Sequence, residues 1–169
     1  FLRLIIDLSA SMSGVKIEGA KRLADLLVQA GELSGSMTEI WGFHTEAVLI
    51  SAQGDREARQ KIAHAGLGYS TRLGAALEEA FHRTPPLQGR REIMVILTDG
   101  ELTDADRVRC QGLLLAEEVS ARLLVPLLLQ GAEQSQYVWS AVFGEAHCVT
   151  PERLPAFLRD YMEELRNPN

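Results

Sequence analysis

The chain has 169 residues, of which 46% are hydrophobic, so it can build one globular domain with a sizeable core. Its formal net charge of -6 excludes the strongly basic surface with which proteins bind nucleic acid or anionic membrane. No apolar stretch approaches the roughly 18 residues that a membrane helix needs, and we expect no membrane partner. A cation or a basic protein patch fits this composition better.

Cysteine usage and the start of the sequence give two further expectations. Cys110 and Cys148 are too few for a disulfide framework and lack the paired spacing of a zinc site. We therefore expect reduced thiols in the core of a cytoplasmic protein. The sequence begins at Phe1, inside an apolar, strand-like run without a signal segment. We expect residues 1–169 to be a single domain that forms the C-terminal part of a longer protein.

The first half of the chain alternates strand and helix patterns. In chain order it is predicted to contain a strand over 2–7, a helix over 15–30, strands over 37–43 and 46–51, and a short helix capped by Asp55. Gly31 and Gly35 are expected to end the first helix. His44 and Thr45 join the two adjacent strands at the length of a hairpin turn, so the second of these strands is predicted to be an antiparallel edge strand.

The second half continues this alternation. In chain order it is predicted to contain a helix over 73–81, a strand over 92–98, a helix from 103 to about 121, a strand over 123–129, a short helix over 135–143, a short strand over 146–149 and a terminal helix. Residues 93–97 are uninterruptedly apolar, which is typical of a parallel strand buried on both faces. The helix after them is expected to carry Val108, Leu115 and Val119 as its apolar residues. Pro126 lacks a backbone donor and is unfavourable in a central strand.

This alternation predicts an α/β, doubly wound (Rossmann-like) fold. We expect a mostly parallel sheet with one antiparallel edge strand and with helices on both faces. In such sheets ligands bind beyond the carboxyl ends of the strands, where the strand order reverses. Asp7 and Asp99 each stand at the carboxyl end of a predicted strand. If those two strands flank the reversal point, their loops meet in one crevice.

The stretch from Asp7 to Ser11 places a carboxylate and two hydroxyls, those of Ser9 and Ser11, at alternate positions. Alternate side chains of an extended backbone leave it on the same side. Oxygen ligands of this kind suit Mg²⁺, Mn²⁺ or Ca²⁺ rather than zinc or copper. Three ligands do not complete an octahedral shell, so others must come from elsewhere. Each residue also has a structural alternative, because serines cap helices and an aspartate before Gly100 is typical of a turn.

Three segments resemble the metal-site segments of von Willebrand factor A (VWA) domains. They are DLSASM at 7–12, TRLGAAL at 71–77 and LTDG at 97–100. Their order and spacing match that family along essentially the whole chain. The resemblance implies a VWA fold with a metal-ion-dependent adhesion site (MIDAS), in which three residues are hydroxyl ligands and two carboxylates stand behind them. The implied site residues are Asp7, Ser9, Ser11, Thr71 and Asp99.

This resemblance also implies a function. A MIDAS holds Mg²⁺, with Mn²⁺ or Ca²⁺ as alternatives, and an acidic residue of a target protein completes the shell of the ion. Residues 68–77, 142–144 and the Leu154-Pro155 pair are similar to the C-terminal VWA domains of bacterial NorD- and CbbO-like proteins. Those proteins are adaptors that bring nitric-oxide reductase or Rubisco, respectively, to a MoxR-type AAA+ ATPase. The implied role is therefore that of a non-catalytic adaptor.

Other functions stay open as alternatives. In haloacid-dehalogenase-like phosphotransfer enzymes the aspartate after the first strand is the nucleophile. That chemistry needs a second acid two residues later, where this chain has Ser9. No P-loop lysine follows the first strand, and no Gly-x-Ser-x-Gly elbow surrounds either serine. A VWA domain of a metal-chelatase subunit is a further alternative.

Several other polar residues have simpler interpretations. Asp104 and Asp106 lack the glycine and the closing glutamate of an EF-hand, so we expect acids at a helix start, with Thr103 as the cap. His44 is expected to be a hairpin histidine rather than a catalytic base. Tyr69, Arg72 and Glu101 are expected on the rim of the metal site, where they would influence the choice of partner.

Overall fold

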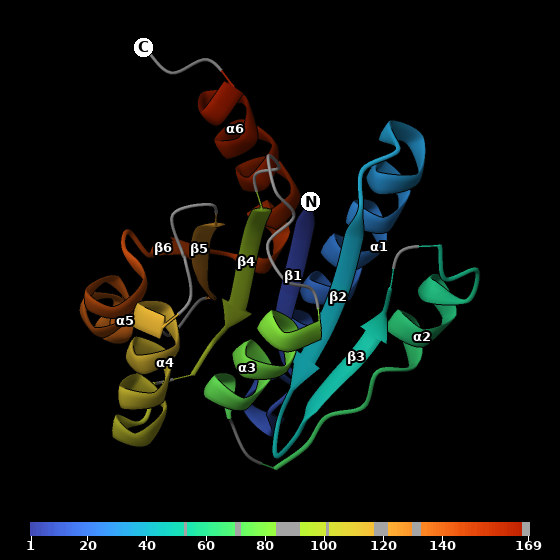
Figure 1. Ribbon diagram of the computed structural model, residues 1–169. Coiled ribbons are helices and arrows are strands. Elements are labelled where there is room, and N and C mark those ends of the chain that lie inside the picture. Colours follow the sequence, from blue (N-terminus) through green and yellow to red (C-terminus); the bar gives the residue numbers. More distant parts are fainter. Residues whose placement is uncertain are drawn as a thin grey trace.

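The computed structural model describes residues 1–52, 54–69, 72–83, 92–100, 102–116, 122–129 and 133–166. These residues form a six-stranded sheet with the order β3-β2-β1-β4-β5-β6 (Figure 1). The strands are β1 (Leu2–Asp7), β2 (Thr38–Phe43), β3 (Ala47–Ser51), β4 (Glu92–Thr98), β5 (Arg122–Leu129) and β6 (His147–Val149). β3 runs antiparallel to β2, and the other neighbouring strands are parallel. The predicted sheet is confirmed.

Helices cover both faces of this sheet, as predicted. They are α1 (Val15–Ser34), α2 (Ala58–His64), α3 (Leu73–Arg83), α4 (Asp104–Ala116), α5 (Gln136–Phe143) and α6 (Leu154–Arg166), with short 3₁₀ turns at Ala10–Met12, Glu133–Ser135 and Pro151–Arg153. One core cluster joins the sheet to α1, α2 and α6, and a second joins it to α3, α4 and α5. Figure 1 shows α3 in front of the sheet and α1 behind it. None of the described helices is long and apolar enough to cross a membrane.

The strand order reverses between β1 and β4, the two central strands. From β1 the chain proceeds to β2 and β3 on one side, whereas β4 leads to β5 and β6 on the other side. Ile6 of β1 is in register with Leu97 of β4, so the loops after these two strands leave the sheet at the same edge. Asp7 and Asp99 therefore meet at the reversal point, where doubly wound sheets bind their ligands.

Helix α1 ends at Ser34 rather than at Ala30, and the prediction that Gly31 helps to end it is wrong. Gly31 lies inside the helix, where an added Cβ would stand 2.3 Å from Thr38 Oγ1. It therefore allows α1 to pack closely on β2. Gly35 ends the helix with a φ of 66°, in the left-handed conformation that glycine favours.

The apolar residues singled out for α4 in the sequence do not form its buried face, and Val119 lies outside the described residues. Val108 is 67% exposed and Leu115 is 88% exposed, whereas Cys110 is fully buried. Leu113 and Leu114 pack beside Cys110 against the same core cluster. Burial raises the pKa of the Cys110 thiol to about 12. Cys148 is exposed, so the expectation of core thiols holds for Cys110 alone.

Pro126 does lie within β5, opposite Ile96 of β4. Strand β6 pairs with β5 only from Leu127 onward. Among the described strands, β4 is thus the one neighbour at the level of Pro126. A proline is tolerated there because edge positions do not need a donor on both sides.

The amino end of β1 holds a buried group of charges, Arg3, Glu39 and Glu92, which we call the amino-end cluster. Arg3 is fully buried; its Nε donates to Glu39 Oε2 at 3.1 Å and its Nη1 donates to Glu92 Oε1 at 2.5 Å. Glu39 also accepts a hydrogen bond from Trp41 Nε1 at 3.1 Å. These bonds tie β1 to both of its neighbouring strands.

Candidate metal centre

The first predicted metal-site segment begins where β1 ends. Asp7 is the last residue of β1, and Ser11 lies in the 3₁₀ turn that precedes α1. Asp7 Oδ1 accepts the backbone N–H of Ser9 at 2.8 Å. Aspartate side chains form this kind of turn by bonding the backbone two residues further on. Asp7 thereby fixes the backbone that carries the Ser9 hydroxyl.

The hydroxyls of Ser9 and Ser11 lie side by side, with their Oγ atoms 2.9 Å apart. Ser11 donates a hydrogen bond to Asp99 Oδ1 at 2.8 Å. A serine has one hydroxyl proton, so the proton between the two serines must come from Ser9. The loop after β1 and the loop after β4 are therefore joined through Ser9, Ser11 and Asp99.

Asp7 is fully buried beneath these hydroxyls. Its Oδ2 accepts the hydroxyl of Thr98 at 2.5 Å, and Thr98 Oγ1 accepts the backbone N–H of Gly100 at 3.0 Å. Burial raises the pKa of Asp7 above its ordinary value, and the charge of Asp99 acts in the same direction, against the hydrogen bonds from Thr98 and Ser9. The surroundings therefore disfavour the negative charge of Asp7, and a cation beside it would relieve that penalty.

Sequence reasoning missed Thr98 and Lys16. Lys16 lies in the first turn of α1, and its ammonium pairs with Asp99 Oδ2. This lysine did carry a signal, because a cation in the first turn of a helix opposes the helix dipole unless an anion lies beside it. Thr98 carried no such signal, since its contact with Asp7 exists only once β4 lies beside β1.

Thr71, the third predicted hydroxyl ligand, lies outside the described residues. The loop that leads to it passes beside Ser9. The N–H of Gly68 donates to the Leu8 carbonyl at 2.7 Å, and Gly68 forms an isolated parallel bridge with Ser9. An added Cβ on Gly68 would stand 2.5 Å from the His44 ring, so glycine permits this close approach.

Two of the three predicted rim residues, Tyr69 and Arg72, are described by the structure. Tyr69, next to Gly68, is fully exposed, and Arg72 is exposed. Glu101 lies outside the described residues.

His44 Nδ1 accepts the N–H of Thr45 at 2.7 Å, which is the local turn contact expected of a hairpin histidine.

Asp106 aligns the starts of α3 and α4. The hydroxyl of Thr103 donates to Asp106 Oδ2 at 3.1 Å, and the N–H of Asp106 donates back to Thr103 Oγ1 at 3.1 Å, which confirms the predicted cap. The other carboxylate oxygen, Oδ1, accepts the N–H of Gly74 in the first turn of α3 at 3.0 Å. Asp106 thus serves two helix starts, and it connects the segment after Thr71 to the segment after Asp99.

The donors at this centre fit a small, hard divalent cation. Neighbouring ligands of an octahedral Mg²⁺, with bonds of 2.0–2.1 Å, lie about 2.9 Å apart. The Oγ atoms of Ser9 and Ser11 are separated by 2.9 Å. The described residues contain no group of three His, Cys, Asp or Glu side chains that could hold a metal, so a site here depends on hydroxyl ligands.

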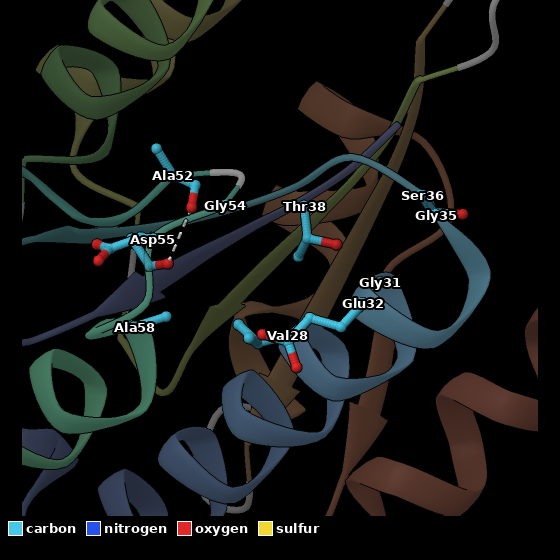
Figure 2. A pocket seen from close by; sticks show the side chains of 11 residues that line it. Val28, Gly31, Glu32, Gly35, Ser36, Thr38, Ala52, Gly54, Asp55 and Ala58 are labelled. Atoms are coloured by element: carbon cyan, nitrogen blue, oxygen red, sulfur yellow. Dashed lines mark hydrogen bonds between the residues drawn. The ribbon is translucent and has the colours of Figure 1, made fainter.

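A pocket at the opposite edge of the sheet is a weaker candidate. Figure 2 shows this pocket at the amino end of β2, between the last turns of α1 and the segment after β3. The N–H of Asp55 donates to the Ala52 carbonyl at 3.1 Å, and its carboxylate pairs with Lys61 at 2.7 Å. Of the two acids that line this pocket, Asp55 is therefore already neutralised and Glu32 is the one acid left among the described lining residues, so the loops after β1 and β4 remain the candidate site.

Comparison with known proteins yields matches among solved structures, while no family model and no curated protein matches the chain. The vWF domain of the type V pili tip protein Mfa5 from Porphyromonas gingivalis matches with a TM-score of 0.79 at 10% identity, covering 98% of this chain and 94% of that chain. A von Willebrand factor type A protein from Catenulispora acidiphila matches with a TM-score of 0.71 at 17% identity, covering 96% and 42% of the two chains.

A third matching structure is that of proximal thread matrix protein 1 from the mussel byssus, with a zinc-occupied MIDAS motif. It has a TM-score of 0.70 at 16% identity and covers 94% of this chain and 43% of that chain. All three likenesses extend over nearly all of this chain, at identities that bear on the fold alone. Together with the strand order, they show that this chain has the von Willebrand factor type A fold.

Proposed function

We propose that the chain is a non-catalytic protein-binding module that grips an acidic residue of a target protein through a divalent cation. The observation that carries this proposal is the pair of hydroxyls of Ser9 and Ser11, 2.9 Å apart, with the carboxylates of Asp7 and Asp99 behind them. Thr71 is the proposed third hydroxyl ligand. Mg²⁺ is the proposed ion, with Mn²⁺ or Ca²⁺ as alternatives, and the zinc-occupied MIDAS motif of the mussel protein supports a divalent ion in this fold.

The proposed site residues have distinct tasks. Ser9 and Ser11 offer neutral oxygen lone pairs. Asp99 accepts the proton of Ser11, which leaves one lone pair of that hydroxyl available beside the one that accepts from Ser9, and Asp7 fixes the backbone of Ser9. A divalent ion bound there supplies an electrophilic position, because neutral hydroxyls leave much of its charge uncompensated. A carboxylate from the target is the ligand whose charge suits that position best.

The rim suits a protein partner. The fully exposed ring of Tyr69 and the exposed side chain of Arg72 belong to the loop that passes Ser9. Tyrosine and arginine are enriched at the energetic centres of protein interfaces. An acidic residue bound at Ser9 and Ser11 would therefore have an aromatic surface and a cation next to it.

We further propose that residues 1–169 form one domain of a longer, cytoplasmic adaptor, which couples a target such as Rubisco or nitric-oxide reductase to a MoxR-type AAA+ ATPase. This step is supported by the resemblance of residues 68–77 and 142–144 to NorD- and CbbO-like proteins.

Ser9 stands where a phosphotransfer enzyme of the haloacid dehalogenase type needs an acid, which favours binding over catalysis. A metal-chelatase subunit would use the same site with a different partner, so the captured protein distinguishes the two roles.

The double substitution Ser9→Ala with Ser11→Ala tests whether the target is bound through a cation at these hydroxyls. It should weaken Mn²⁺ binding by roughly 10–100-fold or more, because disturbing only the groups around a metal ligand already costs that much affinity. It should also abolish the EDTA-sensitive recovery of the target. Isothermal titration with Mn²⁺ and pull-downs with and without EDTA measure both effects.

A matched control exists at the other end of α1. The hydroxyls of Ser34 and Ser36 are also 2.9 Å apart, but they are exposed and lie far from Asp7 and Asp99. Ser34→Ala with Ser36→Ala should leave Mn²⁺ binding and target recovery unchanged. If the Ser9 and Ser11 double variant still recovered its target at full strength, the grip through a cation would have to be abandoned.

A further inference from the structure

Lys16 is a built-in cation at the metal centre. It is the second residue of α1, and its ammonium forms an ion pair with Asp99 Oδ2. The side chain of Asp99 is 1% exposed, whereas that of Lys16 is 27% exposed. The carboxylate is therefore held in the interior, and the ammonium reaches it from the solvent side.

Both oxygens of Asp99 are engaged in this arrangement. Oδ1 accepts the hydroxyl of Ser11 at 2.8 Å, and Oδ2 accepts the ammonium of Lys16. A divalent ion bound to the hydroxyls of Ser9 and Ser11 would be attracted electrostatically by the same carboxylate. Two cations that depend on one carboxylate repel each other, and the repulsion is strong where the site is partly buried.

Lys16 is able to withdraw without unfolding its helix. Its chain of four methylene groups carries the charge at a flexible end, and ammonium groups of this kind are readily re-solvated. Asp99 has no such freedom, because Ser11 holds its other oxygen and the carboxylate is buried. When the two cations compete, the lysine is therefore the partner that moves.

We propose that Lys16 sets the affinity of this centre for divalent cations by competing with the ion for Asp99. This inference rests on the proposed function, since it concerns the same cation site. In the ion-free domain the ammonium neutralises a buried carboxylate and stabilises the loop after β4. Ion binding requires the ammonium to leave Asp99, so part of the binding energy is spent on breaking that pair.

Removing the charge of Lys16 should therefore have two opposite effects. Lys16→Met should bind Mn²⁺ roughly tenfold more tightly or better, because the competing charge is gone. The same variant should melt at a lower temperature than wild type without a divalent ion, because Asp99 is left buried and unpaired. The rise in melting temperature on adding Mg²⁺ should be larger than in wild type.

The experiment compares Lys16→Met with Lys21→Met by Mn²⁺ titration and by thermal melting with and without Mg²⁺. Lys21 lies on the same helix, but its ammonium donates to the Ala63 carbonyl, so its removal changes the net charge equally without touching Asp99. Lys16→Gln serves as a second variant if the methionine variant does not fold. Glutamine keeps an N–H donor for Asp99 and lacks the charge, so it should also tighten Mn²⁺ binding.

The outcomes separate this inference from the proposed function. If wild type binds Mn²⁺ and neither Lys16 variant binds it more tightly than Lys21→Met does, competition by Lys16 is overturned while the cation site stands. If neither wild type nor any variant binds Mn²⁺ or gains stability from Mg²⁺, the cation site itself is overturned. Tighter binding together with lower ion-free stability in the Lys16 variants alone supports the inference.

Discussion

A group of one cation and two carboxylates lies at each end of β1, and the two groups differ in how deeply the cation is buried. At the amino end, one cation, Arg3, stands between two carboxylates, those of Glu39 and Glu92. At the carboxyl end, one cation, Lys16, pairs with Asp99, and the charge of Asp99 in turn acts on the second carboxylate, Asp7. The first group is buried within the sheet, whereas the second lies where the loops after β1 and β4 begin.

This difference follows from how each cation is held. Arg3 is a residue of β1 and is fully buried. Its planar guanidinium forms a hydrogen bond with a carboxylate on each neighbouring strand. Lys16 reaches Asp99 from a separate helix and keeps part of its side chain in water. The amino-end cluster therefore holds three strands together, whereas the carboxyl-end group is the one at which we propose that a second cation binds.

Breaking the amino-end cluster should have the largest effect on stability. Arg3→Met removes the cation and leaves the carboxylates of Glu39 and Glu92 buried without it. We expect a loss of about 3–5 kcal/mol in the free energy of unfolding, as for other buried ion pairs that lose one partner. Chemical denaturation measures this loss. The Mg²⁺-induced rise in melting temperature should persist in the folded variant, and its disappearance would contradict the separation of the two groups.

Removing one carboxylate from each group sharpens the comparison. Asp99→Asn should lower the ion-free stability by only about 1 kcal/mol, because it removes the buried charge itself and the partly exposed ammonium of Lys16 returns to water, but it should weaken Mn²⁺ binding by roughly 10–100-fold. Its matched control, Glu92→Gln, stands at the other end of β4. That control should cost more stability and leave Mn²⁺ affinity unchanged. Titration with Mn²⁺ and denaturation of both variants test the pattern, and equal losses of affinity would refute it.

The smallest effect concerns Asp7 and pH. Its pKa in the folded chain is raised above the ordinary 3.8, chiefly by burial, so the folded state retains this proton to a higher pH than the unfolded state does. The ionised group therefore costs stability, and the cost grows as pH rises from the ordinary value through the raised pKa. Asp7→Asn should make the ion-free domain slightly more stable than wild type at neutral pH.

Thermal melting across pH checks this sign. The advantage of Asp7→Asn should shrink as pH falls and should vanish below the ordinary carboxyl pKa of 3.8, where wild-type Asp7 is protonated in both states. Added Mg²⁺ should reverse the order at neutral pH, because only wild type gains from the ion. An advantage that stayed constant down to low pH would show that burial of the charge is not its cause.

Contiguous parts of the candidate site could be named from the sequence. Asp7, Ser9 and Ser11 lie within one short segment, so their alternate spacing was visible in the sequence. The apolar run 93–97 marked a central strand and placed Asp99 at its end. Gly31 misled the prediction because a buried glycine that serves packing looks, in sequence, like one that ends a helix. The apolar residues of α4 show a related ambiguity, since the small Cys110 and not the larger Leu115 meets the core.

The sequence by itself determined the alternation of strands and helices, the mostly parallel sheet and most of the oxygen ligands proposed at its carboxyl edge. Only the tertiary structure decided that Lys16 meets Asp99, across 83 residues, and that Thr98 meets Asp7, across 91 residues. The physical reason is that periodicity and spacing are local properties. A contact between distant residues depends on which strands pair and in which register, and here the pairing of β1 with β4 brings these groups together.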